Sequence, residues 1–154
     1  MKKEKNLVVQ AKTGTGKTAS FGIPLVELLE PEGYVQAIIL TPTRELALQV
    51  SEEINSLKKK KLKILPVYGG QSISHQIKHL RRGVDIVVGT PGRVLDHIQR
   101  KTLDLSKVSY FILDEADEML DMGFIEDVEK ILKNTSDDKF FLMFSATIPQ
   151  RIIS

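Results

Sequence analysis

A glycine-rich octapeptide holds the first residues of this sequence that could do chemistry. Residues 11–18 read AKTGTGKT, the G-x-x-x-x-G-K-[ST] phosphate-loop pattern with Ala11 at the first glycine position. The glycines allow backbone N–H groups to turn inward around phosphate oxygens, and the Lys17 ammonium can reach the β- and γ-phosphates. A glycine-rich turn before a helix is the plain alternative. The pattern predicts a nucleotide site made of Ala11, Thr13, Gly14, Thr15, Gly16, Lys17 and Thr18.

A pair of carboxylates follows an apolar run about 100 residues further along. The stretch VSYFIL (108–113) leads directly into Asp114, Glu115, Ala116 and Asp117. Asp114 is placed to hold Mg²⁺ through water, with Thr18 as a second ligand, and Glu115 to orient an attacking water and accept its proton. Acidic residues also stabilise a helix N-terminus by complementing its dipole, which is the structural alternative. The preceding phosphate loop favours catalysis.

These motifs need a scaffold that brings strand ends together, and the chain has the pattern of one. Short β-branched runs alternate with amphipathic stretches of helical length, which is typical of βαβ units. The predicted class is α/β, with a mostly parallel central sheet and helices on both faces. Ligands in such sheets bind beyond the carboxyl ends of the strands, where every motif falls. The predicted strands are 6–10, 36–41, 63–68, 84–89, 108–113 and 139–144, and the predicted helices are 17–29, 43–58, 71–81, 91–99 and 123–134.

Length and composition indicate one domain over residues 1–154. Hydrophobic residues make up 42% of the chain and charged residues 27%, and no apolar run approaches the roughly 20 residues of a membrane span. We expect no membrane partner. The chain has no cysteine, which excludes a disulfide framework, and its N-terminus has no secretory signal. We expect an intracellular, cytoplasmic protein.

The charge is unevenly distributed along the chain. Residues 1–100 hold 16 Lys and Arg against 9 Asp and Glu, whereas residues 101–154 hold 6 against 11. Much of the basic excess lies in 58–100, where only Asp85 and Asp96 oppose ten basic residues. This stretch could bind a polyanion, but the run from Lys58 to Lys61 could equally be a solvated face.

Five short strings together resemble the DEAD-box RNA helicases. DEAD (114–117) occurs with PTRELALQ (42–49), GG (69–70), TPGR (90–93) and SAT (145–147), in the order and at the spacing of that family. The resemblance covers essentially the whole chain and implies the first, RecA-like domain of a two-domain core. It implies ATP and Mg²⁺ as cofactors, and ATP hydrolysis coupled to RNA unwinding.

The resemblance also implies a surface for single-stranded or duplex RNA. In the family, PTRELA, GG and TPGR contact the sugar-phosphate backbone, and such contacts position a strand without reading its bases. A turn or helix cap is the alternative for each string taken singly. The RNA-binding residues implied here are Pro42, Thr43, Arg44, Gly69, Gly70, Thr90, Pro91, Gly92 and Arg93.

SAT is implied to connect the nucleotide site with RNA binding and domain closure. Ser145 and Thr147 would hydrogen-bond toward Asp114 or Asp117, although a simple helix cap could use the same residues. The catalytic set implied by the family motifs is Lys17, Asp114, Glu115, Asp117, Ser145 and Thr147.

Two elements of the family lie outside these 154 residues. Only ten residues precede Ala11, and Gln10 does not match the family's upstream adenine-reading motif. The second RecA-like domain, which supplies arginine fingers, would follow Ser154. We expect slow hydrolysis by the 154 residues alone, because such fingers contribute roughly 10³–10⁵ in rate. We also expect an uncovered sheet edge that invites self-association.

Several rival interpretations remain at this point. The chain could be a non-catalytic module that binds nucleotide or RNA, or another phosphate-loop enzyme such as a nucleotide kinase, which would not explain PTRELA, TPGR and SAT. His75 and His79 have a metal-compatible spacing but no third ligand, so we expect surface histidines. Met119, Leu120, Met122 and Phe124 are predicted to pack in the core.

Overall fold

Six parallel strands form a single sheet at the centre of the molecule. The computed structural model describes residues 6–10 and 17–147. Within these ranges the strand order is β1-β6-β5-β2-β4-β3, and every neighbouring pair is parallel. The predicted α/β class and all six predicted strands are confirmed. The strands are β1 (Asn6–Gln10), β2 (Ala37–Leu40), β3 (Ile64–Val67), β4 (Ile86–Gly89), β5 (Tyr110–Leu113) and β6 (Phe140–Ser145).

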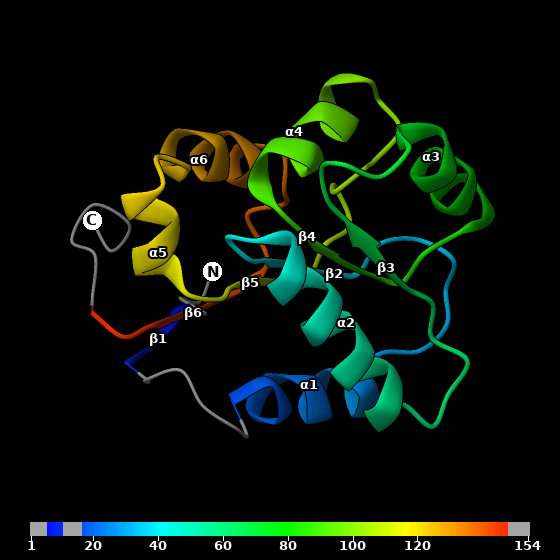
Figure 1. The fold of residues 1–154 in the computed structure, drawn as a ribbon. Coiled ribbons are helices and arrows are strands. Elements are labelled where there is room, and N and C mark those ends of the chain that lie inside the picture. The colour runs from blue at the N-terminus through cyan, green and yellow to red at the C-terminus, as the bar shows by residue number, and fades with distance from the viewer. Residues whose placement is uncertain (1–5, 11–16, 148–154) are drawn as a thin grey trace.

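Helices cover both faces of this sheet, as the alternation of elements predicts (Figure 1). The five predicted helices are present, and their ends differ from the predicted ones by at most two residues. The short helix α5, directly after the acidic string, was not predicted because six residues are too few to show helical periodicity. The helices are α1 (Lys17–Leu28), α2 (Arg44–Leu57), α3 (Ile73–Arg82), α4 (Pro91–Gln99), α5 (Ala116–Asp121) and α6 (Ile125–Lys133).

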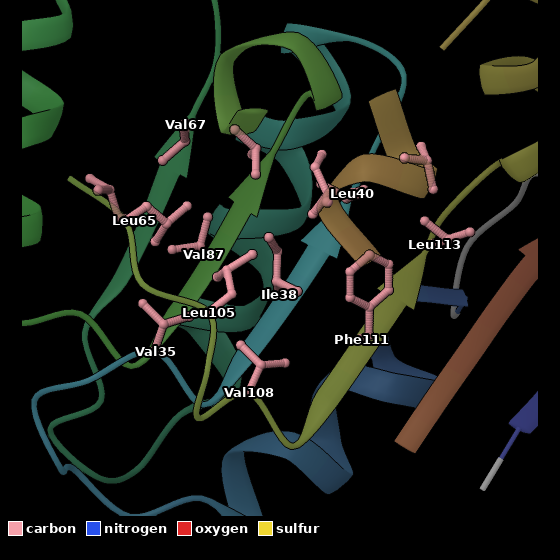
Figure 2. Close-up of a cluster of buried hydrophobic side chains, with 14 of the residues drawn as sticks. Val35, Ile38, Leu40, Leu65, Val67, Val87, Leu105, Val108, Phe111 and Leu113 are labelled. Atoms are coloured by element: carbon pink, nitrogen blue, oxygen red, sulfur yellow. The ribbon is translucent and has the colours of Figure 1, made fainter. Parts of the chain in front are cut away.

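The strand side chains alternate between two hydrophobic clusters. Ala37 and Ile39 of β2 join α1 and α2 on one face, whereas Ile38 and Leu40 join α4, α5 and α6 on the other. All four are completely buried. Figure 2 shows the second cluster, with Phe111 of β5 facing the same side as Ile38. Central strands buried on both faces explain why β2 is an uninterrupted apolar run.

The two edges of the sheet are β1 and β3, each with one strand neighbour. Pro66 lies in β3, where the missing N–H removes no ladder bond from a central strand. The expectation of self-association through an edge stays a prediction. No helix within the described ranges is long and apolar enough to cross a membrane.

A buried carboxylate organises the amino-terminal ends of the strands. Asp85, which is 2% exposed, accepts backbone N–H bonds from Glu32, Gly33 and Lys63 and a side-chain bond from Gln36, at 2.9–3.1 Å. Hydrogen bonds of this kind compensate the desolvation of a buried charge. Asp85 is therefore occupied by hydrogen bonds inside the molecule, and it does not pair with the surface lysines on which the polyanion interpretation rests.

Gly89, at the end of β4, lies where the backbone of β3 and the start of α4 come closest. A Cβ at this position would lie 2.5 Å from Val94 Cγ2 and 2.8 Å from the carbonyl oxygen of Val67. We expect Gly89→Ala to lower the free energy of unfolding by about 1–3 kcal/mol, because a packed core resists an added methyl group. Urea unfolding measures this change. Gly92→Ala is the control, since a Cβ there meets nothing within 4 Å; an equal loss for both variants would contradict the packing argument.

Candidate functional site

The described residues of the predicted nucleotide site lie at the carboxyl ends of three neighbouring strands. β6 lies between β1 and β5, so Ser145 at the end of β6 lies between the strand before the phosphate loop and the strand before Asp114. Lys17 and Thr18 open α1. Residues 11–16, with the predicted Ala11, Thr13, Gly14, Thr15 and Gly16, lie outside the described residues. The parallel order brings together motifs about 100 residues apart.

Lys17 and Asp114 form an ion pair at this edge. Lys17 Nζ lies 2.8 Å from Asp114 Oδ1 and 3.7 Å from Glu115 Oε2. The Asp114 side chain is only 1% exposed, and Oδ1 is a buried oxygen with no hydrogen bond in the described part of the chain, so the lysine neutralises its charge without a well-directed hydrogen bond. A buried carboxylate in this condition favours an additional cation or a polarised water.

The donor set fits Mg²⁺. Asp114 offers an oxygen that has no hydrogen bond, and the buried residue Thr18 offers a hydroxyl; Mg²⁺ prefers such oxygen ligands together with waters and phosphates. In the described part of the chain no group of three His, Cys, Asp or Glu could hold a metal by itself. His75 and His79 stack edge to face at 4.5 Å, but no third ligand of these types completes a metal site with them within the described ranges.

Glu115 has a strained backbone and a perturbed side chain. Its φ of 55° and ψ of 54° place it in the left-handed region, which is uncommon for residues other than glycine. Burial raises the pKa of Glu115, and the charge of Asp114 adds to the rise while Lys17 opposes it. Strain of this kind clusters at functional sites. The left-handed conformation of Glu115 turns the chain from β5 into α5. Both the catalytic and the helix-start interpretations of the acidic string therefore apply.

Asp117 connects the acidic string to the end of β6. Its Oδ2 accepts hydrogen bonds from the backbone N–H of Thr147 at 3.1 Å and from the Thr147 hydroxyl at 3.2 Å. Its own N–H donates to Ser145 Oγ at 3.2 Å, and Ser145 Oγ also contacts the Thr147 carbonyl. Burial acts to raise the pKa of Asp117, but these bonds outweigh it and lower the pKa. Of the two predicted hydrogen-bond partners for Ser145 and Thr147, the structure selects Asp117, which donates to Ser145 and accepts from Thr147.

The predicted RNA residues lie at the carboxyl ends of the other three strands, β2, β4 and β3. A Cβ on Gly70, whose φ is +91°, would lie 3.2 Å from Arg44 Nη1. The Arg44 guanidinium lies over the ring of Tyr68, 5.8 Å from its centroid. Arg93 Nη1 donates to the carbonyl oxygen of Gln71 at 3.0 Å. The structure therefore brings PTRELA, GG and TPGR together.

The two threonines of these motifs both precede helices. Thr43 is the N-cap of α2, and its Oγ1 accepts the Leu46 N–H at 3.2 Å, so the capping alternative holds for this residue. Thr90 is the N-cap of α4 but makes no side-chain capping bond, and Pro91 and Gly92 open that helix. The N-terminus of α4 therefore points the positive end of its dipole toward the same surface.

Some residues of this surface were missed by sequence reasoning. Tyr68 was not among the residues predicted for this surface, yet it lies under Arg44. Gln76 and His97 are completely buried polar residues beside Arg93. The four-residue spacing of Arg93 and His97 on α4 was a usable signal, because residues so spaced share a helix face. Nothing in the sequence singled out Gln76, because no sequence pattern distinguishes a buried glutamine from an exposed one.

Two other sequence expectations are resolved at the side-chain level. Met119 is completely buried as predicted, but Met122 is 49% exposed, so its assignment to the core is wrong. It follows the last residue of the short helix α5, where the chain turns outward to Gly123. In the basic run, Lys58 Nζ donates to the Leu62 carbonyl oxygen and Lys60 Nζ to those of Glu27 and Leu29. Two of the four lysines thus have local structural roles.

The fold and the paired motifs define a phosphate-loop domain of the RecA-like class, and the comparisons identify the family. The family model described as "DEAD/DEAH box helicase" matches residues 1–154, and the chain belongs to this family. A probable ATP-dependent RNA helicase of Methanocaldococcus jannaschii is 62% identical over 152 residues, covering 98% of this chain and 41% of that protein. The DEAD-box ATP-dependent RNA helicase CshA of Bacillus subtilis is 55% identical over 150 residues, covering 96% and 30%.

Solved structures agree with this assignment. The crystal structure of a DEAD box protein from the hyperthermophile Methanococcus jannaschii matches with a TM-score of 0.92 at 63% identity, covering 97% of this chain and 41% of that one. A hypothetical ATP-dependent RNA helicase from Sulfolobus tokodaii matches with a TM-score of 0.86 at 44% identity, covering 97% and 44%. The chain therefore spans less than half the length of these relatives.

The perturbed carboxyl of Glu115 predicts a pH-dependent effect of its replacement. Because its pKa is raised in the folded chain, the native state holds this proton more tightly than the unfolded chain, and stability falls as pH rises through the raised pKa. We expect Glu115→Gln to raise the melting temperature at pH 7 by about 1–4 °C. The gain should shrink toward pH 4, where the wild-type carboxyl is protonated in both states.

Thermal unfolding followed by circular dichroism between pH 4 and pH 7 measures the difference. Glu52→Gln is the matched control, because Glu52 is exposed on α2 away from the site. A gain for Glu115→Gln that stays constant across this range would show that desolvation of the carboxylate is not its cause.

Proposed function

We propose that this chain is the first RecA-like domain of a two-domain DEAD-box RNA helicase core, and that it binds ATP with Mg²⁺ and the backbone of RNA. In the longer protein, ATP hydrolysis would be coupled to unwinding of an RNA duplex. The observation that carries the proposal is the division of one sheet edge into two halves. The Lys17–Asp114 pair lies at the ends of β1, β6 and β5, and the cluster of Arg44, Gly70 and Arg93 lies at the ends of β2, β4 and β3.

The nucleotide half supports binding and water activation by named residues. Lys17 would exchange its contact with Asp114 for the β- and γ-phosphates, and Asp114 and Thr18 would hold Mg²⁺. The metal, when bound, neutralises charge on the phosphate oxygens. Glu115 would orient the attacking water and accept its proton. Its raised pKa suits a base, because a carboxylate that binds a proton more tightly is a stronger one.

The RNA half supports backbone binding without base readout. Arg44 and Arg93 can donate to phosphate oxygens, and the turn at Gly69 and Gly70 carries no side chain that would keep the strand away. The N-terminus of α4 at Thr90 adds backbone N–H groups. A surface of this composition would hold single-stranded or duplex RNA of any sequence.

The bonds of Asp117 support communication between nucleotide and the closing of the two domains. Asp117 follows the Mg²⁺ and water residues by two or three positions, and it holds Thr147 and Ser145 at the end of β6. A shift of Asp114 or Glu115 on nucleotide binding would therefore change the positions of Ser145 and Thr147 in SAT. The second RecA-like domain would supply the arginine fingers and the rest of the RNA surface.

A non-catalytic binding module is the less favoured function. Lys17, Thr18, Asp114 and Glu115 are all present, and the relatives covering most of the chain are named as ATP-dependent RNA helicases. A module that only bound RNA would not require a buried carboxylate with an unsatisfied oxygen beside a lysine. A nucleotide kinase is excluded by the family match over residues 1–154.

We expect Lys17→Ala to weaken binding of a fluorescent ATP analogue in the presence of Mg²⁺ by roughly 10- to 100-fold, the effect of losing a charged hydrogen bond. Equilibrium titration of the 154-residue chain measures the change, with circular dichroism to confirm folding. Lys130→Ala is the control, because Lys130 is exposed on α6. Equal affinity of Lys17→Ala and the unaltered chain would rule out the phosphate site.

We expect Arg44→Ala to weaken binding of a labelled single-stranded RNA and to reduce the salt dependence of that affinity by about 0.7 in the log–log slope, the effect of one lost phosphate contact. Anisotropy titrations at several salt concentrations give this slope. Arg100→Ala, which removes an exposed arginine paired with Asp96, is the control. An unchanged slope for Arg44→Ala would remove Arg44 from the RNA surface.

A further inference from the structure

The buried residue of α3 is a glutamine rather than an apolar side chain. Gln76 is completely buried, while the other residues of this helix are half-buried or exposed. Its Nε2 donates to the carbonyl oxygen of Tyr68 at 3.0 Å and to Gln71 Oε1 at 2.8 Å. Its Oε1 accepts from Arg93 Nη1 at 3.1 Å and lies 2.8 Å from His97 Nε2. One amide thus joins the glycine turn to α4.

The neighbours of Gln76 fix which atoms of this network donate hydrogen bonds and which accept them. Both acceptors lie on the Nε2 side of Gln76, so Oε1 must face Arg93 and His97, and His97 Nε2 must carry the proton that it donates. His97 Nδ1 is then an acceptor for the Thr102 hydroxyl at 2.8 Å, and the single proton of that hydroxyl is shared with the His97 carbonyl oxygen at 3.1 Å. Burial, together with the charge of Arg93, lowers the pKa of His97, which agrees with this neutral form. Every polar atom of Gln76 is satisfied.

The network leaves part of Arg93 available. Arg93 Nη1 is held by two acceptors, Gln76 Oε1 and the Gln71 carbonyl oxygen. Within the described part of the chain its Nε and Nη2 make no hydrogen bond, so these donors can serve a ligand. A guanidinium held at one nitrogen loses less conformational freedom when it binds a phosphate, and such preorganisation increases affinity.

We propose that Gln76, supported by His97, is a positioning residue that fixes the Arg93 guanidinium in one orientation beside the Gly69–Gly70 turn, where Arg93 would bind the RNA backbone. Gln76 is buried and would not touch RNA itself. Its influence on RNA affinity therefore passes through Arg93. This inference rests on the proposed function, because Arg93 must contact RNA for the effect to appear in binding.

The first test needs no RNA. In nitrogen-15 spectra of the chain, a guanidinium held at Nη1 rotates slowly about its Cζ–Nε bond, so the two Nη groups of Arg93 should give separate signals at low temperature. Gln76→Leu, of similar size and without polar atoms, leaves only the Gln71 carbonyl oxygen to hold Nη1, so the two signals should merge at a lower temperature than in the unaltered chain. Identical Arg93 signals in both proteins would overturn the positioning role. Gln76→Glu keeps an acceptor for Arg93 and should preserve the separate signals, which guards against a leucine variant that fails to fold.

The second test is a double-mutant cycle read by anisotropy with a labelled single-stranded oligouridylate. We expect Gln76→Leu to weaken RNA binding by about 3- to 10-fold in the unaltered chain and by less than about twofold in the Arg93→Ala background. Affinity for a fluorescent ATP analogue should not change, because that site lies on the other half of the sheet. Gln76→Glu keeps the acceptor for Arg93 but loses the two Nε2 donors, so its RNA affinity should lie between those of the unaltered chain and Gln76→Leu.

The outcomes separate this proposal from the proposed function. An equal loss of affinity with and without Arg93 would mean that Gln76 acts through general stability, and would overturn the proposal. No RNA binding by the unaltered chain would instead overturn the RNA function proposed above and, with it, the effect on affinity. The Arg93 signals would still decide whether Gln76 holds the guanidinium.

Discussion

The shared carboxyl edge of six parallel strands is the constraint on which the rest of this structure depends. Parallel pairing puts the end of every strand at the same edge, whatever the distance along the chain. The order β1-β6-β5-β2-β4-β3 then sorts the motifs, with phosphate chemistry on one half and arginines beside a glycine turn on the other. Both halves are carried by one core, because β2 and β5, which lie side by side, are buried on both faces.

Burial gives the nucleotide half its chemical character. Asp114 is nearly inaccessible to water and has an unsatisfied oxygen, so its charge depends on Lys17 and favours a further cation. Glu115 is kept in a left-handed conformation next to it, and desolvation makes its proton harder to remove. A site optimised for stability alone would have none of these features, which is the usual relation between stability and activity.

Polar networks connect the parts that a hydrophobic core cannot position. Asp117 gathers Thr147 and Ser145 at the end of β6, while Gln76 joins Tyr68, Gln71, Arg93 and His97 on the other half. Hydrogen bonds are directional, so a satisfied network selects one arrangement of loops where apolar packing would accept several. Both networks lie at the sheet edge that carries the motifs of the DEAD/DEAH box helicase family, to which the chain belongs.

The sequence by itself determined the α/β class, all six strands, five of the helices and the identity of the motif residues, because these depend on local periodicity and on strings such as AKTGTGKT and DEAD. The tertiary structure decided what depends on neighbours distant in the chain. It paired Lys17 with Asp114, chose Asp117 as the partner of Ser145 and Thr147, exposed Met122 and buried Gln76 and His97. Strand order and burial set these contacts, and neither can be derived from the spacing of residues along one chain.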